Sequence, residues 1–257
     1  MALLSKRHGA LRVLAVLAML AVLPCGVGGR VQVSLHFESL CKQCQIHVAA
    51  VRDDVLHGGL EVSASEAGVA QFLNMSIDYY GNIAADGTCE SAANGTEHGP
   101  AMCVTDRYHL CAQHALPTTS AAPDATRWFQ YVHCMFQNID VLKCGSNGYC
   151  AEEPAFRRAL DTVHGMCSSS ASVDGDAIAA CASGSLGRQL QAESYDRTKR
   201  TRRYGFAPVF IDGNYLEGAD AFWRKTPDQL LYGRTLLEAI CTAPESNQSA
   251  PACTAQW

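Results

Sequence analysis

The sequence has no excess of basic residues and, beyond its N-terminal region, no long apolar run. It holds 20 Lys and Arg against 25 Asp and Glu, a net charge of −5, and 18% of its 257 residues are charged. Such a chain has no overall positive field to hold a polyanion, so we predict that nucleic acid is not a partner. Spanning a bilayer takes about 20 consecutive apolar residues. We therefore predict no membrane anchor.

The N-terminal region has the pattern of a secretory signal peptide. Three basic residues at positions 6–8 precede an apolar run over residues 13–23, which ends in a proline and several small residues. This run is shorter than a membrane-spanning helix, so cleavage near Gly28 or Gly29 is favoured over an uncleaved anchor. We predict a signal peptide over residues 1–29 and a single mature domain over residues 30–257.

Thirteen cysteines are the most prominent feature of the composition. An oxidising compartment outside the cytosol lets disulfides form and persist. Cys25 falls in the signal segment and Cys41 and Cys44 stand close together, which leaves ten cysteines for structural disulfides. This parity fits one redox pair on a scaffold stabilised by disulfides. Three Asn-X-Ser/Thr sequons agree with export and predict glycans on three asparagines: Asn74, Asn94 and Asn247.

The first part of the mature chain predicts a strand–helix–strand unit. Residues 31–37 alternate apolar and polar side chains, which is the pattern of a strand. An apolar stripe at helical spacing then runs from Cys44 to Val55 and ends at a Gly-Gly pair. Residues 73–79 alternate again, and two strands joined by a helix are expected to be parallel. The CKQC segment falls where the first strand gives way to the helix.

A cysteine-rich insertion is predicted over about residues 83–203. Residues 84–123 are rich in Gly, Ser, Thr, Ala and Pro and are interpreted as a loop held by disulfides. Three helices are predicted after it, over residues 126–143, 151–166 and 174–192.

The last part of the chain predicts a hairpin and a helix. A strand at residues 208–211 is followed by an Asp-Gly turn and a short returning strand. Thr226-Pro227-Asp228-Gln229 has the pattern of a helix N-terminus. The element order predicts the α/β class: a thioredoxin-like fold with a long cysteine-rich, mainly helical insertion.

The CxxC segment has the placement that thiol–disulfide exchange needs. The N–H groups and dipole of a helix N-terminus favour negative charge, and Lys42 adds to this, so we predict a lowered pKa for Cys41. Cys44 lies a turn deeper on the apolar stripe. We predict that Cys41, uncovered at the helix end, attacks a substrate disulfide and that Cys44 resolves the mixed disulfide.

The CxxC motif alone also permits a structural disulfide or half of a zinc site. For zinc, the second half would be Cys111-Ala112-Gln113-His114. An exported chain offers little to keep four such ligands reduced, and the strand-to-helix placement favours redox chemistry. We predict neither a metal nor another cofactor.

Two further positions are interpreted as parts of the site. Pro208 opens the third strand, where a proline cannot donate to a sheet. In a thioredoxin-like fold a cis proline faces the cysteines here, although an ordinary trans proline is the alternative. We predict Ala207 and Pro208 as substrate-binding residues. His36 and Glu38, in and after the first strand, are interpreted as neighbours of the site, with a plain structural role at least as consistent for His36.

Several segments, in their order along the chain, resemble landmarks of the gamma-interferon-inducible lysosomal thiol reductase (GILT) family. They are Phe37-Glu38-Ser39-Leu40-Cys41-Lys42-Gln43-Cys44, Tyr80-Gly81-Asn82, Cys134-Met135, Cys181-Ala182 and Pro208-Val209-Phe210-Ile211-Asp212-Gly213. The signature segment of that family begins Cys-Gln-His-Gly, and here Cys103-Val104-Thr105-Asp106 takes its place. The chain thus resembles a divergent member.

The resemblance implies a glycosylated thiol reductase that acts on protein disulfides at acid pH in endosomes and lysosomes. It implies that Cys41 is the nucleophile and Cys44 the resolver, and it implies two disulfides, Cys241–Cys253 and Cys167–Cys181. The partners would be disulfide-bonded protein substrates and a small-thiol reductant, and the location lysosomal, endosomal or secreted. Two alternatives remain: a secreted, disulfide-stapled binding protein on an inactive thioredoxin-like frame, or an oxidase or isomerase of the secretory pathway.

Overall fold

The computed structural model describes residues 30–56, 69, 73–91, 99–116, 124–143, 153–201, 204, 207–217, 229–244, 246 and 251–254. Several predicted features lie outside these ranges: the signal peptide, the sequons at Asn94 and Asn247, the helix cap at 226–228, and Cys144 and Cys150. Among the described helices, none has both the length and the apolar character needed to cross a membrane.

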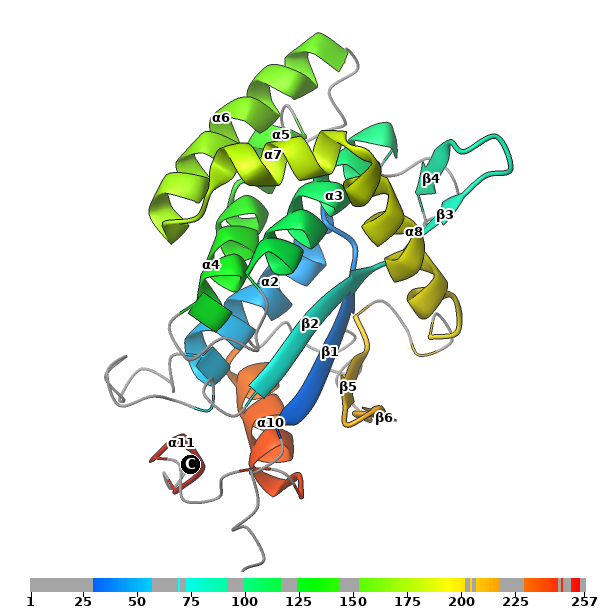
Figure 1. Cartoon of the computed structure of the whole chain (residues 1–257). Helices are drawn as coiled ribbons and strands as arrows, with labels where there is room; N and C mark the ends of the chain where they lie inside the picture. The colour runs from blue at the N-terminus through cyan, green and yellow to red at the C-terminus, as the bar shows by residue number, and fades with distance from the viewer. Residues whose placement is uncertain are drawn as a thin grey trace, which may run out of the picture.

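A four-stranded mixed sheet with the order β2-β1-β5-β6 forms the centre of the molecule (Figure 1). β1, Val31–Phe37, runs parallel to β2, Leu73–Tyr79, so the predicted parallel unit is confirmed. β5, Val209–Ile211, is antiparallel to β1, and β6, Asn214–Tyr215, is antiparallel to β5. The class is therefore mixed α/β, with a small sheet.

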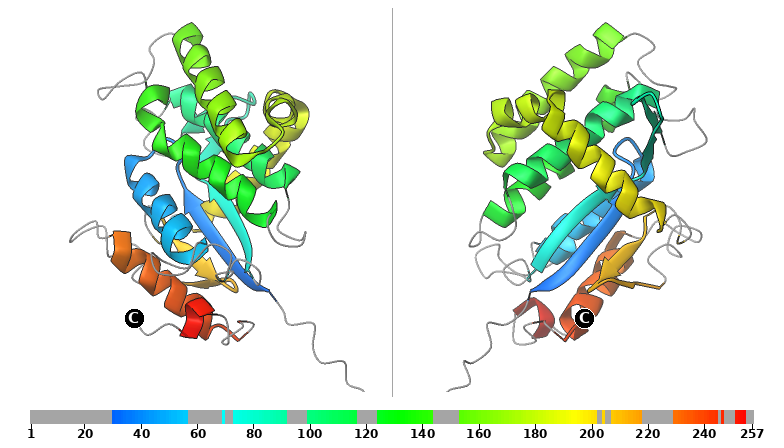
Figure 2. Two further views of the ribbon diagram at one scale, coloured as in Figure 1. Left: turned by 90° about the vertical axis from the view of Figure 1, so that its left-hand side faces the viewer. Right: turned by 45° about the vertical axis from the view of Figure 1, so that its right-hand side comes forward.

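Helices cover both faces of this sheet (Figure 2). α2, Lys42–Ala50, follows β1 and continues into one π-helical segment, η1, Val51–Leu56. α10, Gln229–Thr242, packs against both on the same face, and the short α11, Pro251–Thr254, packs against α10. α8, Ser185–Lys199, crosses the opposite face at β2. α2 therefore follows a strand, β1, that lies between two layers of helices.

The insertion is mainly helical, as predicted, but its first part is not a loop. Residues 84–123 contain β4, Cys89–Ser91, and a long helix, α3, Gly99–Ala115. β4 pairs with β3, Gly81–Ile83, in a separate hairpin. The sequence pattern does not reveal α3, because the buried residues of this helix include polar ones and form no continuous apolar stripe.

The three predicted helices of the insertion are present with different ends. They correspond to α4, Asp124–Gln137, with α5, Ile139–Leu142; to α6, Glu153–Ala171; and to α7, Gly175–Ser183, with α8. The last predicted helix is divided at Gly184, which ends α7 and begins α8 in an extended conformation. A Cβ at Gly184 would lie 3.0 Å from the carbonyl oxygen of Ala180, so the close turn favours glycine.

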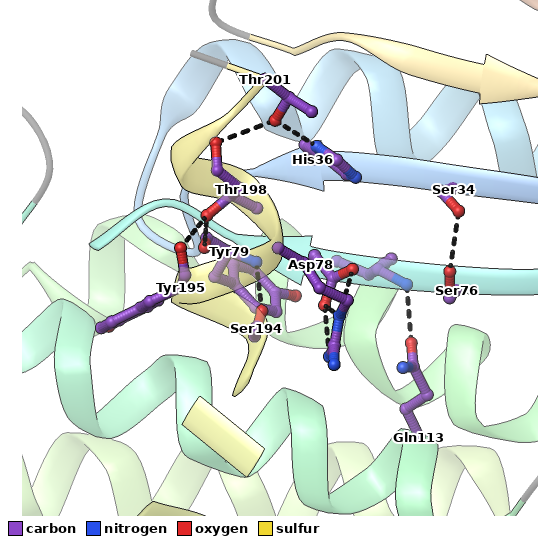
Figure 3. A network of polar contacts seen from close by, with 12 residues as sticks. Ser34, His36, Ser76, Asp78, Tyr79, Gln113, Ser194, Tyr195, Thr198 and Thr201 are labelled. Atoms are coloured by element: carbon purple, nitrogen blue, oxygen red, sulfur yellow. Dashed lines mark hydrogen bonds and ion pairs between the residues drawn. The ribbon is translucent and has the colours of Figure 1, made fainter. Parts of the chain in front are cut away.

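The insertion supplies the hydrogen bonds that the edge strand β2 would otherwise lack (Figure 3). The N–H of Ile77 donates to Gln113 Oε1 at 2.6 Å, and the N–H of Tyr79 donates to Ser194 Oγ at 2.7 Å. Thr198 Oγ1 donates to the carbonyl of Tyr79 at 2.8 Å. Because an unpaired strand edge is open to another chain, α3 and α8 protect the sheet here.

Asn74, the one sequon asparagine in the described residues, lies in β2 with its side chain partly exposed. Its Nδ2 donates to Gln32 Oε1 on β1. Its glycosylation stays a prediction.

Candidate active site

Cys41 is the N-cap residue of α2, at the junction that the sequence predicts. Its backbone N–H donates to the carbonyl of Glu38 at 3.1 Å, and its φ of −85° and ψ of 117° are extended, as is usual for a cap. Its sulfur accepts the backbone N–H of Cys44 at 3.3 Å. The Cys41 sulfur thus takes the position that a serine or aspartate oxygen holds in most helix caps, facing the N–H groups of the first turn.

Both cysteines are free thiols in the structure, and both are buried. Cys44 is fully buried, as its place on the apolar stripe predicts, whereas Cys41 retains 6% of its surface. The expectation that Cys41 is uncovered is therefore wrong. Its position between the end of β1 and the hydrophobic core covers most of the residue.

The two thiols differ in acidity. The pKa of Cys41 is lowered, first by the hydrogen bond from the Cys44 thiol and further by the backbone N–H groups of Cys44 and Gln43. Burial and the charge of Glu38 act against this shift. The pKa of Cys44 is raised well above its usual range, first by burial and then by its contacts with Cys41. The predicted direction of the pKa shift of Cys41 is confirmed, and Cys41 is the more acidic thiol of the pair.

The charge of Lys42 is not among the main causes of the lowered pKa of Cys41. Lys42 Nζ pairs with Asp140 Oδ2 at 2.5 Å, and both side chains are about half exposed. A second lysine, Lys143 at the C-terminal end of α5, interacts electrostatically with Cys41. Burial lowers the pKa of Lys143, and the charge of Cys41 opposes this. Lys143 comes from the insertion, and no pattern in the sequence connects it with the CxxC segment.

Ala207 and Pro208 lie beside the end of β1 that leads to Cys41. The carbonyl of Pro208 accepts the N–H of His36 at 3.1 Å, one residue before Phe37 ends the strand. Both Ala207 and Pro208 are buried. The sheet therefore places Pro208 next to the C-terminal end of β1, the end that leads into the CxxC segment.

His36 is a structural residue of this strand end. Its Nδ1 lies 2.8 Å from Thr201 Oγ1, and Thr201 donates its hydroxyl proton to the carbonyl of Thr198 (Figure 3). His36 Nδ1 is therefore the donor. Burial lowers the pKa of His36 to about 4, so the ring is neutral and joins β1 to the end of α8. Of the two readings of His36, the structural one fits these contacts.

A buried polar cluster lies on the insertion side of the active-site loop, and the sequence gives no sign of it. Asp106 is fully buried on α3, and its Oδ2 accepts the hydroxyl of Tyr195 at 2.7 Å. Gln191 Nε2 donates to Tyr195 Oη at 2.9 Å and to the carbonyl of Cys103 at 2.6 Å. Burial raises the pKa of Asp106 to about 7, against the hydrogen bond from Ser39, two residues before Cys41.

Four disulfides join the described cysteines outside the CxxC segment. They are Cys89–Cys103, Cys111–Cys181, Cys134–Cys167 and Cys241–Cys253. The pair Cys241–Cys253 agrees with the resemblance. The implied pair Cys167–Cys181 is wrong, because α4 lies beside α6 and α3 beside α7, which gives each of these cysteines a different neighbour. Sequence spacing carries no information on this helix packing.

The zinc alternative fails on the same connectivity. Cys111 is bonded to Cys181, and Gln113 in the same segment is bound to β2, so the CxxH segment has no free thiolate to offer. No group of three or more metal-binding side chains occurs within the described ranges. The thiols Cys41 and Cys44 are left as a pair within one helical turn, which is the arrangement of a dithiol redox centre.

Comparison with known proteins identifies the class to which this site belongs. The model of a thiol reductase family matches residues 32–154 of the chain. That family is described as gamma interferon inducible lysosomal thiol reductase (GILT), and the match supports membership of the chain in it. The matched range contains the strand–helix–strand unit with Cys41 and Cys44. No curated protein matches the chain significantly.

Proposed function

We propose that this protein reduces protein disulfides through a Cys41–Cys44 mixed-disulfide mechanism on a thioredoxin-like frame. The observation that carries the proposal is the asymmetry of the pair: the Cys41 sulfur faces the helix N–H groups, and the Cys44 sulfur is buried behind it. The strand order β2-β1-β5-β6, with α2 and α10 on one face, supports the thioredoxin-like frame. Membership of a thiol reductase family supports the activity.

The reaction follows from the different acidity of the two sulfurs. The Cys41 thiolate attacks one sulfur of the substrate disulfide, forms a mixed disulfide, and releases the other substrate sulfur as a thiolate that takes up a proton. Cys44 then loses its proton and attacks the Cys41 sulfur. This step releases the second substrate thiolate and leaves the Cys41–Cys44 disulfide, which two equivalents of a small thiol reduce again.

The lowered pKa of Cys41 supports activity at acid pH. Exchange requires the thiolate, and a free thiol with a pKa near 8.5 is almost fully protonated at the pH of a lysosome. Hydrogen bonds from the Cys44 thiol and from backbone N–H groups lower the pKa of Cys41 and so raise its thiolate fraction at acid pH. We propose a lysosomal, endosomal or secreted glycoprotein with a cleaved signal peptide over residues 1–29, which agrees with the sequons and the disulfides.

Substrate binding is proposed at Ala207 and Pro208. These residues adjoin the strand end that positions Cys41, since Pro208 is hydrogen-bonded to His36. A substrate segment bound along the backbone of Ala207 would bring its disulfide toward the Cys41 sulfur. The backbone of Ala207 would then orient the substrate disulfide, while the side chains of the pair do the chemistry.

A trapping experiment tests the proposal. The Cys44→Ser variant is mixed at pH ~5, in the lysosomal range, with a disulfide-bonded protein, and covalent adducts are analysed by non-reducing electrophoresis and peptide mass spectrometry. Adducts joined through Cys41 are expected, because the serine cannot resolve them. The Cys41→Ser variant is the matched control and should give none. Absence of adducts from Cys44→Ser, in a protein whose other disulfides are intact, would refute the mechanism.

The low exposure of Cys41 is the observation that favours the alternative of an inactive binding protein. That alternative predicts a Cys41 that iodoacetamide does not modify after mild reduction, whereas the reductase predicts modification that continues below neutral pH. An oxidase or isomerase would share the reactive thiol but would have a less reducing potential. Equilibration of the Cys41–Cys44 pair with glutathione buffers separates these two activities.

A further inference from the structure

A pocket of about 540 Å³ lies in the insertion and is lined by residues of α3, α8 and the β3–β4 hairpin. Figure 1 shows these three elements next to one another. Its volume is in the range of small-molecule sites. Its wall includes apolar side chains of Ile83, Val104 and Ala192 and the disulfide Cys89–Cys103. None of the residues assigned above to the thiol site lines it, so it is a separate cavity.

Two arginines, Arg107 of α3 and Arg188 of α8, line this pocket. Burial lowers the pKa of Arg107, and the positive charge of Arg188 acts in the same direction, so the two guanidinium groups are close enough to repel each other. Asp106, next to Arg107 in sequence, directs its Oδ2 to Tyr195 instead. Within the residues that the structure describes, Arg188 Nη1 donates to the carbonyl of Ser183 at 3.2 Å.

Neither arginine forms an ion pair with a carboxylate in the described part of the chain. Arg107 Nε is buried there without a hydrogen-bond partner. A buried charged donor with no partner is costly, and two like charges in one apolar cavity add to that cost. An oxyanion between the guanidinium groups would remove both penalties, because the planar guanidinium matches the geometry of carboxylate and phosphate groups.

We propose that this arginine pocket, formed around Arg107 and Arg188, binds a small organic anion. The acidic head, a carboxylate or a phosphate, lies between the two guanidinium groups. The apolar body of the ligand packs against Ile83, Val104 and the Cys89–Cys103 disulfide. A ligand with both parts should bind more tightly than an inorganic anion, since the wall of the pocket is mainly apolar.

Titration calorimetry on the mature protein at low ionic strength tests this inference, with hexanoate, hexyl phosphate and inorganic phosphate as probes. We expect saturable binding of at least one hexyl probe, tighter than that of inorganic phosphate, and the preferred hexyl probe identifies the head group. Arg188 is exposed, so Arg188→Gln leaves the core intact. This variant should weaken binding about tenfold or more, the usual effect of losing a hydrogen bond to a charged group.

Two further variants make the test specific. Ala192→Phe adds bulk at an exposed position of the pocket wall without changing the charge, and it should also weaken binding. Arg158→Gln removes an exposed charge from α6, outside the pocket, and should leave binding unchanged. The inference is overturned if no hexyl probe binds, if inorganic phosphate binds as tightly as the hexyl probes, or if Arg158→Gln weakens binding as much as Arg188→Gln.

Discussion

The sheet-centred frame and the helical insertion use their cysteines in opposite ways. In the frame, Cys41 and Cys44 are free thiols one helical turn apart, and the strands are held by buried aliphatic side chains. In the described part of the insertion, three disulfides join different elements: β4 with α3, α3 with α7, and α4 with α6. In the frame, the disulfide Cys241–Cys253 joins α10 with α11. The difference shows that position decides the role of a cysteine. A local pair at a helix end is suited to exchange, and a distant pair to stability.

The largest expected effect comes from opening the longest of these loops. Cys111 and Cys181 are 70 residues apart, and replacing both with alanine should lower the free energy of unfolding by about 4 kcal/mol, through the entropy regained by the unfolded chain. Replacing Cys241 and Cys253, 12 residues apart, should cost about 3 kcal/mol. Urea unfolding measures both. If the variant without Cys111 and Cys181 were as stable as the wild type, the stabilising role of the disulfides in the insertion would be contradicted.

The buried carboxyl of Asp106 in the insertion and the buried histidine His36 in the frame respond to pH in opposite directions. The pKa of Asp106 is raised from 3.8 to about 7, so the folded state holds this proton more tightly than the unfolded state. The contribution is therefore complete below about pH 4 and is lost as the pH rises through about 7. The buried histidines His36, His47 and His109 have lowered pKa values and act in the opposite direction in both proteins. Relative to Asp106→Asn, the wild type should therefore lose a few kcal/mol of stability over this range.

Thermal and urea unfolding between pH 4 and pH ~8 would measure this effect. Asp161→Asn, at an exposed position of α6, is the matched control and should follow the wild type. Parallel pH profiles for the wild type and Asp106→Asn would contradict the assignment.

The smallest expected effect concerns a residue of the insertion that acts on the frame. Lys143 interacts with the charge of Cys41, whereas Lys42 pairs with Asp140 at the surface. Lys143→Gln should slow alkylation of Cys41 by iodoacetamide at pH ~6 by about threefold, the size of an electrostatic effect near the surface. Lys42→Gln should change the rate less. If Lys42→Gln slowed alkylation more than Lys143→Gln, the sequence-based prediction that Lys42 lowers the pKa of Cys41 would be supported instead.

The sequence predicts the elements whose pattern is local. The alternation of residues 31–37 and 73–79 and the stripe from Cys44 correspond to β1, β2 and α2, and Cys41 falls at the helix cap as expected. These elements bury apolar side chains at regular spacing, so the pattern and the structure have the same cause.

The sequence fails where burial involves polar groups or distant contacts. α3 buries Thr105, Asp106 and His109, and the partners of Asp106 and His109 come from other elements, so the helix resembles a loop in composition. The pairing of Cys181 depends on which helix lies beside α7, and the proximity of Lys143 to Cys41 depends on the return of α5 to the frame. None of these contacts has a local sequence signal.

Gly81 is the point where the two regions fit together most tightly. A Cβ on this residue would lie 2.1 Å from the ring of Tyr195, so the aromatic face rests directly on the main chain just after β2. Any larger residue would lever the Tyr195 ring away and pull its hydroxyl off Asp106. The absence of a side chain at Gly81 thus makes room for Tyr195 of α8. Even one added methyl group there would weaken the contact between the insertion and the sheet.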